Sequence, residues 1–368
     1  MALLRELRAG DRLRVKRYKI AVIPGDGIGP EVVDAALGPM ETAARKHDFA
    51  LDLERLPYSA DHYLRTGETL PDPAFRHLRD DVDAILLGAI GDPRVPGNEH
   101  ARDILLGLRF RLDLYVNFRP VQLLHPDLTP LSAVKGGGGR ARAGQGYPID
   151  FVIFRENTEG VYLGRGRIEG DQYIAEEVNT AKGVERIVRA AFDWAKAHGK
   201  ARVTMSDKAN AVPAHRIWQE TFRQVAAQYA GIEAEHRYVD ALAMELVREP
   251  ERFDVIVTNN LYGDILSDLG AALVGGLGLA PSANLHPGRP GLFEPVHGSA
   301  PPLAGKGIAN PLAAILTGAL MFEQLGHPDA ARDLERAVKE TLRAGVRTSD
   351  IGGAATTEQV AQATQQRL

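Results

Sequence analysis

Three arginines each follow a run of mostly apolar residues in one part of the sequence: Arg109, Arg119 and Arg155. An arginine at the end of an apolar strand can face inward, where its planar fork of donors suits two-point binding of a carboxylate or phosphate. A single such arginine usually belongs to a structural ion pair. Three of them indicate a site for a di-acid or a phosphorylated compound.

Three aspartates form a second candidate set. Asp264 and Asp268 are four residues apart, so on a helix both carboxylates share one face, where like charges repel unless a divalent cation lies between them. Asp240 is a third acid, within an apolar stretch. The chain contains no cysteine, so these carboxylates favour Mg²⁺ or Mn²⁺ over Zn²⁺. Solvated surface acids are the alternative interpretation.

Proton transfer has two candidate residues. Lys208 follows a short apolar strand, and a desolvated lysine there has a lowered pKa and can act as a base. Tyr162 lies in a short polar and glycine-containing segment and can relay a proton. Taken singly, each residue is more often structural.

Small residues surround His297 and Asn310 in the segments 294–301 and 305–311. Such a loop can wrap closely around a planar or phosphorylated ligand. A second glycine-rich turn at 25–29 follows an apolar strand, but its spacing is Gly-x-Gly-x-Gly and Pro30 removes a backbone donor, so it is a poor dinucleotide fingerprint. A structural turn and a turn beside a cofactor both remain open.

The elements that must position these residues alternate between strand and helix. Apolar runs predict strands at 19–23, 82–90, 149–154, 203–205 and 255–258, with helical stretches between most of them. This pattern indicates an α/β protein. The basic, glycine-rich segment 135–146 is interpreted as a solvated loop, and residues 1–17 as a short amphipathic helical extension.

Composition excludes several classes. The 368 residues carry a formal charge of −4, with 44% hydrophobic and 25% charged residues, so neither nucleic acid nor an anionic membrane is an expected partner. The absence of cysteine excludes disulfides, thiolate metal sites and a thiol nucleophile. The uncharged stretch 269–288 contains prolines and several glycines, so we expect no spanning helix and a cytoplasmic protein.

Taken together and in this order, these segments resemble the β-decarboxylating dehydrogenases, a family that includes 3-isopropylmalate, isocitrate, homoisocitrate, tartrate and D-malate dehydrogenases. The resemblance runs from about residue 19 to the C-terminal region. It implies an isopropylmalate-dehydrogenase-like two-domain fold that is not a Rossmann fold, with the active site in the cleft between domains. The larger, discontinuous domain would comprise 1–114 plus 275–368, and the central domain 115–274 would carry a dimerisation arm.

The resemblance also implies roles for the candidate residues. The three arginines would bind the carboxylates of the substrate, the three aspartates would bind the metal, and Lys208 and Tyr162 would be the catalytic pair. Lys208 and Asp240 would act in the site of the neighbouring subunit of a homodimer, with a tetramer as the alternative. The loop that would hold NAD contributes His297, Gly298, Ser299, Ala300 and Asn310.

Substrate choice in the family depends on the segment before the first arginine. Leu105 and Leu106 fall where isopropylmalate enzymes present apolar side chains, and a third carboxylate would be costly to bury against them, so 3-isopropylmalate and a role in leucine biosynthesis are expected. The segments 115–121 and 282–285 resemble tartrate and D-malate enzymes equally, so these substrates stay alternatives, as do isocitrate and homoisocitrate.

NAD is the expected cofactor, although Pro302 stands where many NAD-using members have an aspartate. The basic and aromatic residues typical of NADP-dependent isocitrate enzymes are absent at this location. A non-catalytic regulatory subunit is the alternative from a different class. The presence of Lys208, Tyr162 and all three acids argues against it.

Overall fold

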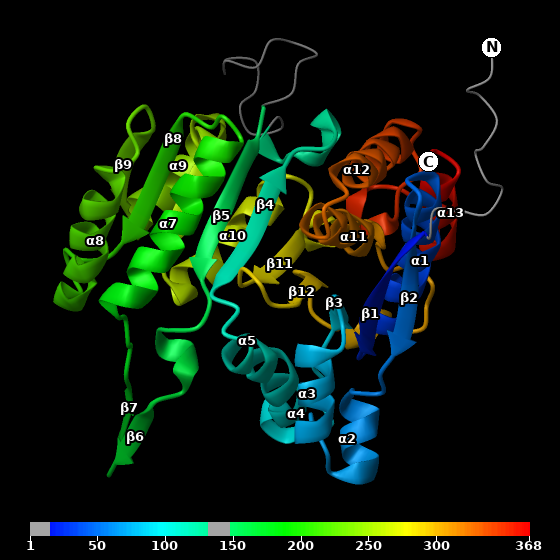
Figure 1. Cartoon of the computed structure of the whole chain (residues 1–368), viewed down its shortest axis with the longest axis horizontal. Helices are drawn as coiled ribbons and strands as arrows, with labels where there is room; N and C mark the ends of the chain where they lie inside the picture. Colours follow the sequence, from blue (N-terminus) through cyan, green and yellow to red (C-terminus); the bar gives the residue numbers. More distant parts are fainter. Residues whose placement is uncertain (1–14, 132–147) are drawn as a thin grey trace, which may run out of the picture.

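A ten-stranded sheet forms the centre of the computed structural model, which describes residues 15–131 and 148–368 (Figure 1). The predicted loop at 135–146 and nearly all of the predicted N-terminal extension lie outside the described residues. The strand order is β2-β1-β3-β12-β11-β4-β5-β10-β8-β9. The strands are β1 (Lys16–Gly25), β2 (Phe49–Arg55), β3 (Ala84–Ala89), β4 (Val116–Gln122), β5 (Asp150–Glu156), β8 (Arg202–Asp207), β9 (Glu233–Tyr238), β10 (Val255–Thr258), β11 (Pro281–Leu285) and β12 (Gly291–Pro295).

The two ends of this sheet are parallel and its middle is antiparallel. β2, β1, β3 and β12 pair in parallel, as do β5, β10, β8 and β9, whereas β12, β11, β4 and β5 pair antiparallel. Each parallel end is covered on both faces, which parallel sheets require. In the described residues the α-helices are α1 (Gly29–Lys46), α2 (Ala60–Thr66), α3 (Asp72–Asp80), α4 (Glu99–Ala101), α5 (Gly107–Arg111), α7 (Ala181–Ala197), α8 (Arg216–Ala226), α9 (Val239–Arg248), α10 (Asn260–Leu273), α11 (Leu312–Gln324), α12 (Pro328–Arg343) and α13 (Thr357–Gln365).

Four hydrophobic clusters fill the spaces between the sheet and its helices. Two of them combine the strands near both chain ends with α1, α3, α5, α11, α12 and α13. The other two combine the middle strands with α7 and α8 on one face and α9 and α10 on the other. Segments from both ends of the chain therefore share a core, and the boundaries of the discontinuous domain at 114 and 275 stay a prediction.

The predicted α/β class and all five predicted strands are confirmed. The residues 19–23, 203–205 and 255–258 fall in β1, β8 and β10, and the ranges 82–90 and 149–154 overlap β3 and β5, extending one or two residues beyond them. The other five strands of the sheet lie outside these five ranges. β2 and β9 are edge strands with polar residues, β4 contains a proline and an arginine, and β11 and β12 are short with a proline at one end, so none shows a simple apolar run.

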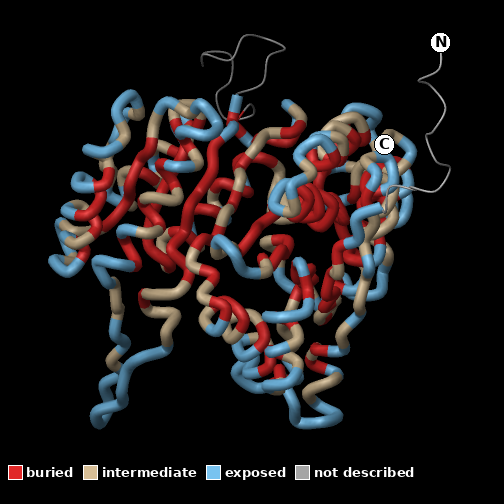
Figure 2. Tube along the Cα trace, viewed as in Figure 1, coloured by how far each residue is buried: buried red, intermediate tan, exposed pale blue. Residues whose placement is uncertain are grey.

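A two-stranded arm extends away from the sheet (Figure 1). Its antiparallel strands are β6 (Gly166–Glu169) and β7 (Gln172–Ala175). Most of the arm is exposed in the single chain (Figure 2), including the apolar side chains of Ile168 and Tyr173. Among the described residues, every helix is too short or too polar to serve as a membrane span.

Candidate active site

Arg155 lies at the centre of the candidate site, near the end of β5 and directly against α10. Its Nε and Nη2 donate to Asn260 Oδ1 at 2.9 and 2.7 Å, and its Nη1 donates to Asp264 Oδ1. The close approach depends on Gly263, because a Cβ there would lie 2.6 Å from Arg155 Cβ. The sequence thus packs the helix that carries the acids onto the strand that carries the arginine.

The other two arginines reach the same region from different elements. Arg119, inside β4, donates to Ser267 Oγ at 2.6 Å and to Asp264 Oδ1 at 3.2 Å. Arg109 donates to Glu294 Oε1 at 2.7 Å from helix α5. The expectation of strand ends was therefore wrong for Arg109, where the apolar run is helical, and for Arg119, which is mid-strand.

This arginine cluster is buried and keeps unpaired donors, although Arg119 Nη1 also lies 3.6 Å from Asp268 Oδ1. All three arginines are at most 6% exposed, and the Nε atoms of Arg109 and Arg119 are buried without a hydrogen-bond partner among the described residues. Burial and the neighbouring charge of Arg119 lower the pKa of Arg155 to about 9. An anionic ligand with two carboxylates would satisfy the free donors and offset the positive charge.

Tyr162 contacts the same cluster from the short turn Val161–Leu163. Its hydroxyl donates to Asp264 Oδ2 at 2.6 Å, and the Arg155 guanidinium lies 5.2 Å from its ring centre. Burial, together with the hydrogen bond to Asp264, raises the pKa of Tyr162. The hydroxyl therefore keeps its proton near neutral pH, as a proton donor must.

Asp264 and Asp268 share one face of α10, as their spacing predicts. Burial alone would raise the pKa of Asp264, but the charges of Arg155 and Arg119 hold it below its ordinary value. Burial raises the pKa of Asp268, and Asp264 adds to this. Within the described residues no three acidic or histidine side chains gather closely enough to hold a metal ion, so the metal-binding role of Asp264 and Asp268 stays a prediction.

Lys208 and Asp240 form a separate pair. Lys208 follows β8, Asp240 begins α9, and their side chains meet at 2.8 Å between Nζ and Oδ2. In the described part of the chain, no hydrogen bond or ion pair joins either residue to the arginine cluster. The structure therefore separates the predicted residues Lys208 and Asp240 from the arginine cluster, and their assignment to a neighbouring subunit stays a prediction.

Leu105 and Leu106 lie in a π-helical turn, Arg102–Leu106, between α4 and α5. π-Helical turns are uncommon and often mark functional sites. Leu108, one residue before Arg109, is fully buried, whereas Leu105 and Leu106 are only half-buried. The two leucines therefore have side-chain surface left to contact a ligand near Arg109.

The loop from His297 to Asn310 packs against the glycine turn at 25–29. The Ile28 amide donates to the Ser299 carbonyl at 2.8 Å, and a Cβ at Gly27 would lie 2.0 Å from that oxygen. Gly27 has φ +58°, so both its conformation and its surroundings require glycine. The turn is thus a structural support for the loop.

The same loop keeps unused polar groups. His297 Nδ1 lies 3.1 Å from the Gly298 carbonyl, while its Nε2 is buried without a partner among the described residues. Burial lowers the pKa of His297, so this nitrogen is a neutral acceptor. Ala300 has φ +40°, and a Cβ at Gly298 would meet open space. These features fit a loop that receives a polar, planar ligand, whereas the Asn310 amide is already bonded to Asp350 at 3.1 Å.

The sequence analysis did not predict two of the side chains that accept hydrogen bonds from the arginines, Glu294 and Asn260. Glu294 is buried in β12 and accepts from Arg109 and, at 2.9 Å, from Asn284 Nδ2. Asn260 accepts from Arg155 and donates to the Glu159 carbonyl at 2.8 Å. A glutamate between a phenylalanine and a proline in an apolar run was the available signal for Glu294.

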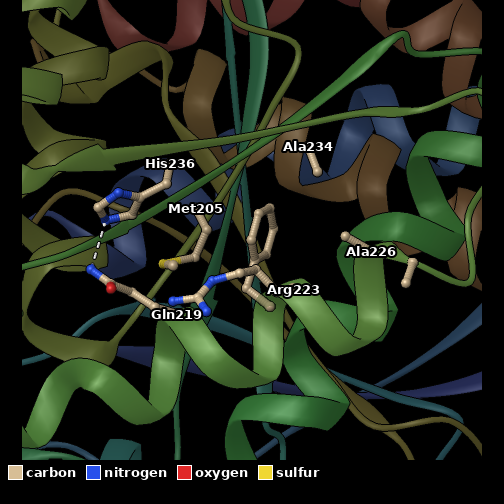
Figure 3. Close-up of a pocket in the computed structure, with 8 residues that line it drawn as sticks. Met205, Gln219, Arg223, Ala226, Ala234 and His236 are labelled. Carbon is tan, nitrogen blue, oxygen red and sulfur yellow. Dashed lines mark hydrogen bonds between the residues drawn. The ribbon is translucent and has the colours of Figure 1, made fainter.

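A pocket of about 330 Å³ lies between α8 and the strands β8 and β9 (Figure 3). It is lined by mostly apolar side chains with three polar ones, Gln219, Arg223 and His236. Gln219 Nε2 lies 3.4 Å from His236 Nε2, and His236 pairs with Asp207, the residue before Lys208, at 3.2 Å. The pocket therefore borders the strand end that carries Lys208 and contains none of the candidate site residues.

Comparison with known proteins decides the family. A model described as isocitrate/isopropylmalate dehydrogenase matches residues 19–365. The chain belongs to this family. A family member from Thermobifida fusca named 3-isopropylmalate dehydrogenase is 43% identical over 364 residues, which cover 97% of this chain and 99% of that protein. Another from Streptomyces griseus, with the same name, is 46% identical over 88% of this chain and 91% of its own length.

The fold agrees with a solved member of the family. The crystal structure of isocitrate dehydrogenase from Methylococcus capsulatus matches with a TM-score of 0.85 at 39% identity, over 95% of this chain and 99% of that chain. The family and fold expected from the sequence are thereby confirmed. The roles of the individual family residues in this chain stay predictions.

Proposed function

We propose that the protein oxidatively decarboxylates a (2R)-hydroxy di-acid of the malate type, 3-isopropylmalate, with hydride transfer to NAD. The observation that carries this proposal is the buried cluster of Arg109, Arg119 and Arg155 around Asp264 and Tyr162, in a chain whose relatives include proteins named 3-isopropylmalate dehydrogenase. The cluster offers an anion site, carboxylates for a cation and a proton donor at one place.

The arginines would bind and orient the two carboxylates. The unpaired Nε donors of Arg109 and Arg119 are buried and point to no other described partner, so a carboxylate there replaces a missing hydrogen bond. Leu105 and Leu106 would contact the isopropyl group. A third carboxylate against these leucines would lack a partner, which favours isopropylmalate over isocitrate.

Asp264 and Asp268, with Asp240 of a second copy, would hold Mg²⁺ or Mn²⁺. Three carboxylates form a hard oxygen donor set of the kind these ions prefer. When bound, the cation supplies positive charge that stabilises the oxygen anions formed during oxidation and decarboxylation. Asp264 is already deprotonated by its arginine neighbours, and it therefore offers a charged ligand near neutral pH.

Two residues would move protons. Lys208 accepts the proton of the substrate hydroxyl as the hydride leaves that carbon, and Tyr162 donates a proton to the carbon that loses CO₂. The raised pKa of Tyr162 keeps that proton available. His297, Gly298, Ser299, Ala300 and Asn310 would line the cofactor side, where Pro302 and Leu303 provide no charge to bind a 2′-phosphate.

The active unit would be a cytoplasmic homodimer, or a tetramer. Met244 and Val247 on α9, the helix that carries Asp240, and Ile265 on α10 are large apolar side chains exposed in the single chain. Exposed apolar side chains on neighbouring helices favour an interface between copies. Such an interface, extended by the arm β6–β7, would bring Lys208 and Asp240 to the cluster of the partner.

The test is an initial-rate assay with Mg²⁺ or Mn²⁺. We expect NAD reduction with 3-isopropylmalate at a kcat/KM above that with D-malate, tartrate, isocitrate and homoisocitrate, and above that with NADP. A higher kcat/KM for another acid would reassign the substrate. The absence of turnover with every acid would contradict the proposed activity.

A further inference from the structure

A buried histidine links the Lys208 loop to the helix that carries the acids. The Lys208 backbone amide donates to His215 Nδ1 at 3.2 Å, and His215 Nε2 lies 3.0 Å from Glu177 Oε1. The His215 side chain is fully buried. Because Nδ1 accepts from an amide, Nε2 carries the ring hydrogen and donates it to Glu177. The imidazole thus joins two groups on opposite sides of a rigid ring.

Glu177 continues this path to α10. Its Oε1 also accepts from Asn259 Nδ2 at 3.0 Å and from Asn179 Nδ2 at 3.2 Å. Asn259 is the N-terminal cap of α10, because its Oδ1 accepts from the Tyr262 amide at 2.9 Å. The hydrogen bond from His215 lowers the pKa of Glu177, so the carboxylate is charged and binds its three donors strongly.

We propose that His215 and Glu177 are positioning residues, which fix the backbone of Lys208 relative to α10 and thereby set where the lysine acts. This inference rests on the proposed function, in which Lys208 is the base. The hydrogen-bonded path runs from the Lys208 amide through His215, Glu177 and Asn259 to the start of the helix bearing Asp264 and Asp268. One chain would thus couple its own acids to the lysine it lends to the partner's site.

Among the described side chains, only His215 accepts a hydrogen bond from the Lys208 amide. His215 and Glu177 therefore connect this amide to the interior of the protein. The remaining backbone bonds of this loop stay local, such as Ala211 and Val212 to the Lys208 carbonyl at 2.9 and 2.7 Å. They shape the turn, and another link toward α10 is the hydrogen bond from Thr258 Oγ1 to the Ser206 carbonyl at 2.8 Å, two residues before Lys208. Displacement of a reacting group by about 1 Å can lower a rate by about 100-fold, so a small shift of this loop is enough to affect turnover.

The experiment compares His215→Ala, Glu177→Ala and Glu177→Gln in the full-length protein. We expect kcat to fall by about 10- to 100-fold in both alanine variants, with the KM values for the hydroxy acid and NAD within about twofold of the wild type. Glu177→Gln keeps the accepting oxygen and should remain within about threefold. The double alanine variant should lose no more than either single one, because both remove the same path.

Two further measurements separate positioning from general damage. Hydrogen exchange at the Lys208 amide should accelerate in His215→Ala, while the oligomeric state stays that of the wild type. The control is His47→Ala, which breaks another histidine–carboxylate pair, with Asp333 at 2.9 Å, far from the site and should leave kcat unchanged. Glu177 is only partly buried, so its variants carry the test even if His215→Ala does not fold.

Several results would overturn the inference. The first is a kcat within twofold of the wild type in both alanine variants. The second is a fall in kcat that appears only when the oligomer dissociates. The third is a fall in kcat that is equal in Glu177→Gln and Glu177→Ala. Failure of the proposed function gives a different pattern, in which the wild type turns over none of the hydroxy di-acids. The exchange rate of the Lys208 amide would still report whether His215 holds the loop.

Discussion

The arginine cluster and the Lys208–Asp240 pair contain residues of the same charge types in opposite environments. In the cluster, Arg155 is 2% exposed, and hydrogen bonds to Asn260 and Asp264 fix its position. In the pair, the Asp240 side chain is 66% exposed and is bonded to Lys208. A single chain thus positions all three arginines of the cluster. In the pair, the Lys208 backbone is held by His215, while the Asp240 side chain is open to solvent.

This difference in burial indicates that folding of one chain positions the arginines, whereas Lys208 depends on a second chain for its final surroundings. Buried guanidiniums must be positioned during folding, because an unpaired buried charge is costly. A lysine that takes up a proton has to reach the reacting atoms, and it gains its desolvated surroundings only when a second surface covers it. The exposed apolar residues on α9 and α10 are suited to provide that surface.

The largest expected effect comes from the exposed side of this comparison. Lys208→Ala should lower kcat by about 1,000-fold, because it removes the amine that would accept the proton of the substrate hydroxyl. The free energy of unfolding should change little, since an ion pair whose carboxylate is largely exposed contributes little to stability. Steady-state kinetics and chemical denaturation measure the two quantities. Lys200→Ala is the matched control, because it breaks a similar pair with Asp150 at 3.0 Å. Near-normal turnover of Lys208→Ala would remove the lysine from the mechanism.

Hybrid dimers of two inactive variants test whether the Lys208–Asp240 pair of one chain meets the arginine cluster of the other. Lys208→Ala and Tyr162→Phe should each be nearly inactive alone. After co-refolding in equal amounts, half of the dimers are hybrids, and each hybrid has one site with both changes and one site with neither. About a quarter of the wild-type activity should therefore return. If each site were built from one chain, no activity would return, and that result would contradict the shared site.

Within the buried cluster, Arg155→Lys should lower kcat/KM by about 100-fold. Lysine cannot bond Asn260 at two points while also reaching Asp264, so the carboxylate site loses its geometry although it keeps its charge. The kinetic constants for the hydroxy acid measure this effect. Arg202→Lys is the control, since Arg202 makes an equivalent two-point contact with Glu233 at the opposite end of the sheet's strands. An equal effect of both changes would show that the loss does not depend on the substrate.

The two regions also differ in how far the sequence predicts them. The Asp264–Asp268 pair follows from helical spacing alone, and α10 confirms that both lie on one helix. The partners of the arginines do not follow, because Glu294 lies 185 residues from Arg109 and Asn260 lies 105 residues from Arg155. Such contacts depend on the strand order, in which half of the strands lacked a simple apolar run.

His215 shows a similar limit. A lone histidine in a helical segment is most often a satisfied core residue, and its sequence neighbours do not indicate that its ring returns to the Lys208 amide. The separation of Lys208 from the arginine cluster could be expected only from the family resemblance. No local pattern of residues tells which side chains a second copy supplies.

The smallest expected effect concerns Glu156, next to Arg155 in the buried region. Burial raises the pKa of Glu156 to about 7 from its ordinary value of 4.5, although Thr158 and Glu159 donate hydrogen bonds to it. A raised folded-state pKa means that the protonated form favours the fold. Its stabilising contribution is complete below pH 4.5 and is lost as the pH rises through about 7. Above that pH, ionisation of Glu156 in the folded protein lowers the free energy of unfolding by up to about 3 kcal/mol.

Glu156→Gln should therefore be more stable relative to the wild type at pH 8 than at pH 5, as measured by urea unfolding at one protein concentration. The gain is expected because the amide accepts some of the same hydrogen bonds without carrying a charge into the core. Thr158→Val is the control, since it keeps the carboxylate and should retain or enlarge the wild-type decline. A difference between Glu156→Gln and the wild type that is equal at both pH values would mean that the donors around Glu156 and Arg186, 3.6 Å away, already keep it ionised.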